Sequence, residues 1–413
     1  MTNMLNKKIN VNLYIIAQCI IMFNFYLCTL KIYAEKLVIY SYFLIGIAIM
    51  LFLLSGIYKK FKLSFMPTAF IILFGYMLLT DVINANFSSF DCYMAIACFL
   101  LCYFFSFFLN DKEDNIKSLT YNFYVCLVCS TLLSIFSLIV IFRDNNLDGI
   151  TINRNALASC ACVSIIGSYW LINKKNKISL INLIVLLCDL INIFTLIKTE
   201  SRTPLTLLAT FIIVMLAYYA FFVFGKKFNK LFILVLFILI SLLIVGIVFS
   251  FIIKRNVVDE SSGSIRNIID RISSGRLTLW EACFDLISES PITGVNNDTF
   301  HQKTISDLGT YYYHQHSVYI GLMTIHGIPS FLIYLAIIIF TIINSLKIIF
   351  TSKDTESIKR VSFFFAFLLG LLVSDLFESY TFSSFIPYAF IVFLMYNSIE
   401  IERLSMEKDL IKG

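Results

Sequence analysis

Short charged segments divide the sequence into long apolar runs, and the length of these runs limits what the chain can fold into. A helix needs about 20 apolar residues to cross the roughly 30 Å hydrocarbon core of a membrane. Runs of about this length occupy 11–30, 37–57, 65–83, 92–109, 119–142, 156–172, 178–197, 204–224, 231–253, 316–346, 361–378 and 384–400. They lack the alternation that marks a membrane β-barrel. The pattern predicts an all-α, polytopic integral membrane protein with about 12 transmembrane helices.

The composition excludes a soluble domain. Of the 413 residues, 59% are hydrophobic and 14% charged, whereas soluble domains carry roughly a quarter charged residues. The run 11–30 is too long for a signal-peptide core and has no small-residue cleavage pattern after it, so we expect an uncleaved first span. Nearly all of the 11 cysteines lie in or beside apolar runs, where a thiol packs as a small hydrophobe, and no disulfide framework is expected.

The distribution of basic residues predicts the topology. If the N-terminus is cytoplasmic, the short cytoplasmic loops hold most of the 32 lysines and arginines, as the positive-inside rule requires. Both ends are then cytoplasmic, and one large loop faces outward between helices 9 and 10. The predicted parts are helices 1–9 (1–253), the extracytoplasmic loop (254–315), helices 10–12 (316–400) and a cytoplasmic tail (401–413).

Arginine departs from this pattern, because most arginines are predicted on the outer face and most lysines inside. The planar guanidinium grips phosphate or carboxylate through two hydrogen bonds. The sorting therefore predicts an anionic ligand on the outer face, with solvated loop charges as the alternative. The outer arginines are Arg143, Arg154, Arg202, Arg255, Arg266, Arg271 and Arg276.

All 4 histidines, His301, His314, His316 and His326, lie in the large loop or in the first turns of the helix after it. His316 shares a predicted helix face with Tyr319 at the membrane rim. A histidine there can accept a proton from a hydroxyl, so this region is the candidate centre of chemistry. A structural histidine is the alternative. A metal site at His314 and His316 would lack further ligands at suitable spacing.

Arg202 is predicted at the outer start of span 8, beside Ser201 and Thr203, either of which could cap the helix. A helix N-terminus and an arginine together attract an anion. The alternative is an arginine that anchors the helix end among lipid headgroups.

A short amphipathic helix is predicted within the large loop, ended by Pro291 and Gly294. Such a helix could lie on the outer surface with its aromatic stripe in the membrane interface. The stripe comprises Arg276, Trp280, Phe284 and Ile287.

Acidic and amide side chains are the remaining candidates for a functional role. Asp375 and Glu378 are predicted near the outer end of span 11, and Asp189 near mid-depth in span 7. Acids within a membrane are costly and default to functional hypotheses. Glu378 could pair with an outer arginine or orient His316, whereas Asp189 could simply bond a neighbouring helix. The Asn-Arg-Asn sequence that ends at Asn155 opens span 6 with groups able to bind sugar hydroxyls.

Together these residues resemble the O-antigen polymerase and O-antigen ligase family (Wzy-type polysaccharide polymerases) of bacterial surface polysaccharide assembly. The order, spacing and loop size match over roughly the C-terminal two-thirds of the chain. Two positions depart from the family: Ser317 stands where asparagine is usual, and Asn296 where a second glycine is frequent. The matching pieces are Asn153 to Ala158, Ser201 to Thr203, Gly275 to Gly294 with Trp280 and Pro291, His316 to Tyr319, Gly327 and Glu378.

The resemblance implies a metal-independent glycosyltransferase without a cofactor, whose donor is a polyprenyl-diphosphate-linked oligosaccharide. Arg202 and Arg276 would hold the diphosphate, His316 would deprotonate the acceptor glycan's hydroxyl, and Glu378 would support it. Tyr311, Tyr312 and Tyr313 could stack on sugar rings, with an interfacial aromatic belt as the alternative. The residues expected to contact substrate are Arg154, Asn155, Arg271, Trp280, His314 and Tyr319.

Within the family we favour a polymerase of capsule, O-antigen or exopolysaccharide repeat units, because a polymerase also serves cells that lack an outer membrane. A ligase that passes the finished chain to a lipid core is the alternative. A transporter or flippase would carry paired mid-depth charges and broken helices in two like halves, which the sequence lacks. The expected location is the bacterial inner membrane, with membrane lipid as environment, a flippase and a chain-length regulator as candidate partners, and no nucleic acid.

Overall fold

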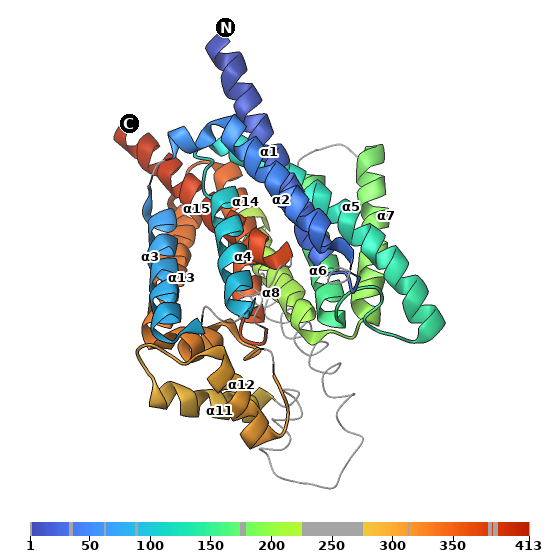
Figure 1. Cartoon of the computed structure of the whole chain (residues 1–413). Helices are drawn as coiled ribbons and strands as arrows, with labels where there is room; N and C mark the ends of the chain where they lie inside the picture. The colour runs from blue at the N-terminus through green and yellow to red at the C-terminus, as the bar shows by residue number, and fades with distance from the viewer. Residues whose placement is uncertain are drawn as a thin grey trace.

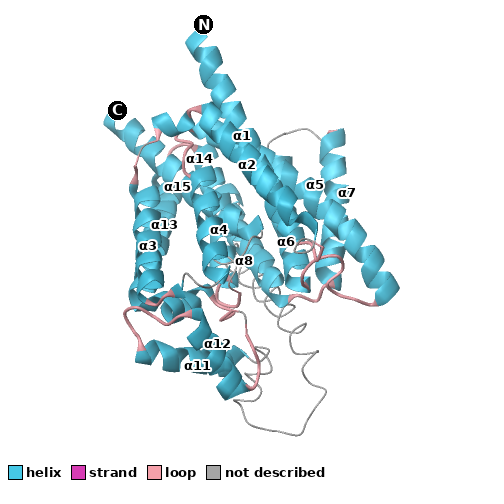
Figure 2. Ribbon diagram, viewed as in Figure 1, coloured by secondary structure: helices cyan, strands magenta, loops and turns pink. Residues whose placement is uncertain are grey.

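The computed structural model describes residues 2–32, 36–61, 63–86, 90–173, 179–224, 276–312, 314–378, 382 and 387–412. This part of the chain is helical, apart from an isolated antiparallel bridge between Leu30 and Thr151 (Figure 2). The long helices are α1 (Thr2–Cys28), α2 (Val38–Ser55), α3 (Phe65–Ile83), α4 (Phe90–Ser106), α5 (Lys112–Asp144), α6 (Arg154–Asn173), α7 (Leu180–Lys198), α8 (Arg202–Tyr218), α13 (Val318–Thr351), α14 (Thr355–Ser374) and α15 (Pro387–Lys412).

The all-α membrane class is confirmed. Every predicted span within the described residues overlaps one of these helices, and nine helices there are long and apolar enough to cross a membrane. The predicted span 231–253 lies outside the described residues, so the count of twelve stays a prediction. The described part of the predicted large loop forms two shorter helices, α11 (Arg276–Glu289) and α12 (Asn297–Leu308).

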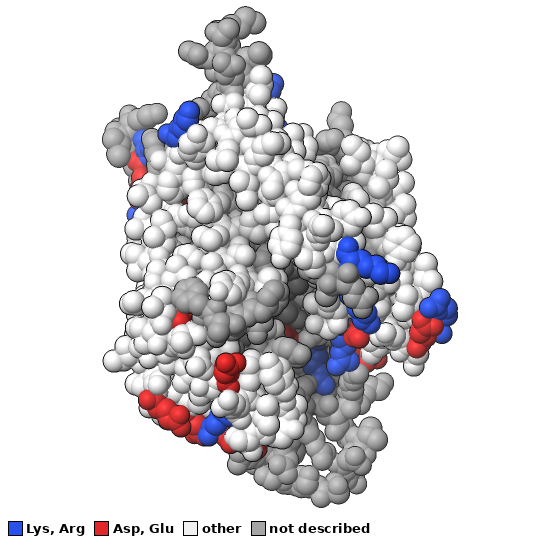
Figure 3. Space-filling view, viewed as in Figure 1, with Lys and Arg blue, Asp and Glu red and all other residues white. Residues whose placement is uncertain are grey.

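The outer surface of the bundle is apolar. On α2, Ile39 is 72% exposed and Phe43 68%, and on α7 Leu180 is 73% exposed. Large apolar side chains in such density on the outside face of a helix are stable against lipid and not against water. In the view of Figure 3, the charged side chains lie mostly toward the ends of the bundle, and the surface between them is largely uncharged.

The centre of the bundle is α15, in which every residue from Pro387 to Glu402 is buried. Around it, α14 packs against α8 and α15, and α6 also packs against α8 and α15. This packing brings the N-terminal ends of α6 and α8 and the C-terminal end of α14 together. The α11 and α12 helices lie at one end of the bundle, and both chain termini lie at the opposite end (Figure 1).

The segment after α11 crosses α13 at a break in that helix. Gly327 has φ +79° inside α13, and a Cβ there would lie 2.0 Å from the carbonyl oxygen of Ile292. Because the glycine has no side chain, the two backbones approach closely. The amide of Ile328 donates to the carbonyl of Pro291 at 2.8 Å, and the amide of Val295 donates to that of Thr324 at 2.8 Å. These contacts fix α11 against the helix that follows His316.

The segment after α11 is also held by α3. The hydroxyl of Tyr76 donates to the carbonyl of Ile292 at 2.5 Å. The side-chain Nδ2 of Asn84 donates to the carbonyl of Thr293 at 2.8 Å. The predicted end of the amphipathic helix at Pro291 and Gly294 therefore coincides with a docking point for two long helices.

Candidate active site

Three polar side chains from separate segments converge on the carboxylate of Glu378, which follows α14. Asn155, in the first turn of α6, donates through Nδ2 to Oε1 at 2.7 Å. Arg276, the first residue of α11, donates through Nη2 to the same oxygen at 2.7 Å. Nδ1 of His316, just before α13, lies 3.3 Å from Oε2. We call these four residues the Glu378 cluster.

The cluster is buried at its centre and opens toward His316. The side chain of Glu378 is 5% exposed, that of Arg276 16% and that of His316 33%. A buried carboxylate needs a paired charge and filled hydrogen bonds, which Arg276 and Asn155 supply. The histidine is the member of the cluster most accessible to a substrate.

His316 is held in one orientation by its backbone and by its neighbours. Its φ is +51°, in the left-handed region that non-glycine residues rarely adopt and that often marks functional sites. Trp280 Nε1 donates to the carbonyl of Gln315 at 2.9 Å. On the other side, the amide of Val318 donates to the carbonyl of Asp375 at 2.9 Å. The second contact joins the start of α13 to the turn that carries Glu378.

The contact with Glu378 selects a tautomer of His316. A carboxylate only accepts hydrogen bonds, so Nδ1 carries the proton in this contact. In the neutral ring Nε2 is then the nitrogen with a lone pair, and it can accept a proton.

Asn155 links the cluster to Arg202. The hydroxyl of Ser201 donates to Oδ1 of Asn155 at 2.7 Å, while the amide group of Asn155 donates to Glu378. Ser201 occupies the N-cap position of α8, but its side chain makes no capping hydrogen bond. Of the two residues that could have capped this helix, Ser201 does not, and its hydroxyl donates to Asn155 instead. Arg202 is the next residue, at the first position of α8.

The predicted short helix exists as α11. Its protein-facing side includes Leu279 and Cys283, which are fully buried against α12 and α13. Within the predicted stripe, Phe284 is 52% exposed and Ile287 7%, and the place of the stripe in the membrane interface stays a prediction. Burial raises the pKa of the Cys283 thiol to about 12, so this cysteine packs as a protonated, unreactive group.

Of the residues predicted to contact substrate, only Asn155 belongs to the Glu378 cluster among those that the structure describes. Tyr319 faces the bundle interior: its hydroxyl donates to the carbonyl of Leu372 at 2.8 Å and its ring stacks on Tyr334. His314 lines a cavity on α13. Arg154, the first residue of α6, is adjacent to Asn155 in the chain, and Arg271 lies outside the described residues.

The histidines separate into different environments, although they are close in the sequence. His301 is buried in α12, where Nδ1 lies 2.8 Å from the carbonyl oxygen of Tyr312. Its ring stacks on that of Tyr311 at 4.4 Å. The ring of Tyr312 contacts His316 edge to face at 6.3 Å, and Tyr313 lies outside the described residues.

The two departures from the family pattern have the same explanation. The hydroxyl of Ser317 accepts from the amide of Ile320 and caps α13. The Oδ1 of Asn296 accepts from the amide of Thr299 at 2.7 Å and caps α12. Serine and asparagine are among the residues most favoured at a helix N-cap. Serine can therefore replace asparagine beside His316 at little cost.

Sequence reasoning missed Gln315 and Asp81, and it named Asp375 only as an acid near the outer end of span 11. Gln315 and Asp375 hold the histidine segment through backbone carbonyls, which carry no signature in the sequence. Asp81, near the end of α3, is buried beside His326. An acid within a predicted span was the available signal for Asp81.

The fold and the cluster define a class: a polytopic membrane protein with a buried carboxylate that joins an arginine and a histidine at one end of the helical bundle. Residues 183–335 match the family model described as O-antigen ligase. This match confirms the resemblance to the O-antigen polymerase and ligase family that was read from the motifs. Arg202, Arg276 and His316 fall within the match, and Asn155 and Glu378 outside it. No curated protein matches the chain.

Proposed function

We propose that this protein is a membrane glycosyltransferase that moves an oligosaccharide from a polyprenyl-diphosphate carrier to a hydroxyl of an acceptor glycan. The family match supports a function of the O-antigen ligase and polymerase type. The observation that carries the specific proposal is the convergence of Arg276, His316 and Asn155 on the buried carboxylate of Glu378. This arrangement combines a proton acceptor with a cationic group.

His316 is the general base of the proposed reaction. Glu378 holds Nδ1 in its protonated form, which leaves Nε2 to take the proton of the acceptor hydroxyl. The carboxylate also stabilises the imidazolium that forms, because an opposite charge close by favours the charged ring.

Arg276 and Arg202 stabilise the leaving group. As the acceptor oxygen bonds to the anomeric carbon, the bond from that carbon to the phosphate oxygen breaks and negative charge grows on the polyprenyl diphosphate. Guanidinium groups suit a diphosphate because each offers a planar set of donors. The contact with Glu378 engages Nη2 of Arg276. In the proposed reaction the other guanidinium donors of Arg276 bind the diphosphate. Arg202 adds its charge at the N-terminus of α8, where backbone dipoles favour an anion.

Asn155 is a positioning residue in this scheme. Its amide bridges Glu378 and Ser201, so the carboxylate is fixed relative to the start of α8 and to Arg202. The base His316 and the arginines are then held in a fixed geometry relative to one another, so that proton transfer and stabilisation of the leaving group occur in the same complex.

We favour a repeat-unit polymerase in the inner membrane, with both termini cytoplasmic and the Glu378 cluster at the outer face. The cluster and the termini lie at opposite ends of the bundle, as this orientation requires (Figure 1). A ligase remains the second candidate, because the matching family model carries that description.

The experiment that tests the proposal is an electrophoretic analysis of surface glycan from a strain that lacks the gene. The strain is complemented with wild type, His316→Ala or Arg143→Ala. Arg143 is a suitable control because it is exposed and pairs with the adjacent Asp144. We expect wild type and the control to restore the ladder of long chains, and His316→Ala to accumulate single lipid-linked units on the outer leaflet.

Two other outcomes would change the assignment. Lipid-linked ladders that never reach their final acceptor would identify a ligase. Repeat units retained on the cytoplasmic leaflet would contradict a transferase and indicate a flippase.

A further inference from the structure

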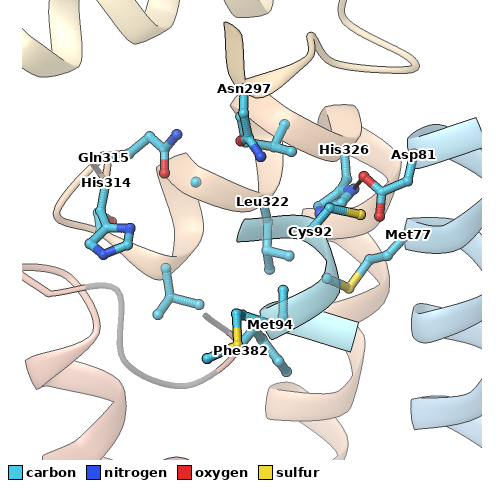
Figure 4. A pocket seen from close by; sticks show the side chains of 15 residues that line it. Met77, Asp81, Cys92, Met94, Asn297, His314, Gln315, Leu322, His326 and Phe382 are labelled. Carbon is cyan, nitrogen blue, oxygen red and sulfur yellow. Dashed lines mark ion pairs between the residues drawn. The ribbon is translucent and has the colours of Figure 1, made fainter. Parts of the chain in front are cut away.

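A cavity of about 120 Å³ lies on α13 between α3, α4 and the start of α12 (Figure 4). Gln315 and Ser317, the two neighbours of His316 in the chain, line it. The segment that presents His316 to the Glu378 cluster therefore also forms one wall of this cavity. Neither the proposed base nor the proposed diphosphate ligands lie in its lining.

The cavity has a polar part and an apolar part. Polar side chains reach it from three elements and from the segment before α13, and Met77, Leu322 and Phe382 supply the apolar surface (Figure 4). Its described lining contains a carboxylate and no lysine or arginine, so the cavity disfavours an anion. The polar members are Asp81, Asn297, His314, Gln315, Ser317 and His326.

Asp81 and His326 form a buried pair inside the bundle. Asp81 is 6% exposed and His326 9%, and Oδ1 of Asp81 lies 3.7 Å from Nδ1 of His326. Asn86 Nδ2 donates to the same carboxylate oxygen at 2.9 Å, and the hydroxyl of Thr80 lies 2.8 Å from His326 Nδ1. A carboxylate buried in the protein is costly to keep and the transfer reaction does not use it, which favours a binding role.

We propose that this cavity binds a sugar residue of the acceptor glycan, an inference that rests on the proposed transferase function. Sugar hydroxyls both donate and accept hydrogen bonds, and carboxylate, amide and imidazole groups match them, while apolar side chains cover the C–H face of the ring. Because the described lining contains no lysine or arginine, this site does not suit the diphosphate of the donor.

The position explains how the acceptor is presented. A sugar held against Gln315 and Ser317 lies beside the backbone of His316, so a hydroxyl at its edge, or on the sugar next to it, is directed to the base. In this arrangement the cavity that contains Asp81 recognises the acceptor. Arg276, in the Glu378 cluster, recognises the leaving group.

The test measures binding of the free repeat-unit oligosaccharide, released by mild acid from the lipid-linked units of the deletion strain. Titration calorimetry uses the full-length protein in detergent. Ala95→Phe fills the cavity from α4 without removing a polar group. Ala97→Phe, on the same helix and of similar partial exposure but outside the lining, is the matched control. We expect Kd to rise at least tenfold for Ala95→Phe and to stay within twofold for Ala97→Phe.

Asp81→Asn is the second variant, and it keeps the size of the side chain while removing its charge. It should weaken binding several-fold while the protein still folds, and it tests the inference independently if Ala95→Phe does not fold. Equal Kd values for wild type and the folded cavity variants, or no binding to wild type, would overturn the inference. His316→Ala separates the two proposals: it should bind the oligosaccharide normally and form no polymer, whereas polymer from this variant would refute the proposed reaction and leave the binding result intact.

Discussion

Glu378 and His316 are 62 positions apart in the chain, and their side chains meet with 3.3 Å between Oε2 and Nδ1. The other carboxylate oxygen accepts from Arg276 and Asn155, each at 2.7 Å. The oxygen that faces His316 is therefore Oε2. Because a carboxylate oxygen accepts a hydrogen bond, Oε2 keeps the proton on Nδ1 of His316 and so sets the histidine tautomer.

Replacing Glu378 by glutamine should reverse that tautomer. The amide oxygen would stay with Arg276 and Asn155, and the amide nitrogen would turn toward His316 as a donor. Nδ1 would then accept, Nε2 would carry the proton, and the ring could no longer act as a base. We expect the initial rate of polymer formation in isolated membranes to fall by about 10²-fold or more. Glu289→Gln, at the exposed end of α11, should keep the wild-type rate, and a wild-type rate for Glu378→Gln would remove the carboxylate from the mechanism.

His316 and His314 should differ sharply when each is changed to alanine. His316 contacts Glu378, whereas His314 lines the cavity on α13. We expect His316→Ala to abolish transfer and His314→Ala to leave measurable activity with weakened acceptor use. The measurement is polymer yield at matched protein levels. The reverse order would move the base to His314.

The two arginines should be needed for chemistry rather than for folding. Arg276→Lys keeps a positive charge beside Glu378 but loses the planar fork, so it tests the grip on the diphosphate while the ion pair can still form. We expect transfer by Arg276→Lys and by Arg202→Ala to fall by about 10²-fold, the usual effect of losing a donor to a developing charge. Arg143→Lys serves as the control. Wild-type polymer from either variant would exclude that arginine from the site.

The fold class could be predicted because membrane span length is a local property of the sequence. Eleven of the expected spans overlap helices of the described chain, from α1 to α15. The convergence of Arg276, His316 and Glu378 was expected only through the motifs and the resemblance. No local rule in the sequence places an arginine 102 positions from the glutamate that it pairs with.

Helix rotation is the information that the sequence lacks. The α11 helix has two apolar stripes, and contact with α12 and α13 selects Leu279 and Cys283 over Phe284. Rotation also decides which acid within a span meets a partner. Asp81 faces His326 across α3 and α13, although Asp189 is the acid that lies nearer the middle of its run. Asn155 was expected to bind sugar, and its role as a bridge depends on tertiary contacts alone.

The glycine at the break in α13 should be intolerant of a side chain. Alanine at Gly327 would adopt an unfavourable positive φ and place its Cβ 2.0 Å from the carbonyl oxygen of Ile292. We expect Gly327→Ala to lower the free energy of unfolding by at least about 2 kcal/mol and to reduce activity, because α11 and Arg276 would shift. Gly46→Ala in α2, where a Cβ meets nothing within 4 Å, should be neutral in a thermal unfolding assay in detergent. Equal melting temperatures for the two variants would contradict the tight backbone crossing.

The charge on the leaving group should be neutralised by guanidinium groups without a dissociable metal ion. In the proposed reaction two guanidinium groups face the leaving diphosphate: Arg276, which is paired with Glu378, and Arg202, at the N-terminus of α8. A chelator added to the purified enzyme in detergent should therefore change the transfer rate by less than twofold, while salt should slow it by screening the arginines. Activity lost to the chelator and restored by a divalent cation, with Arg276→Lys still active, would show that a metal ion and not the arginine carries this role.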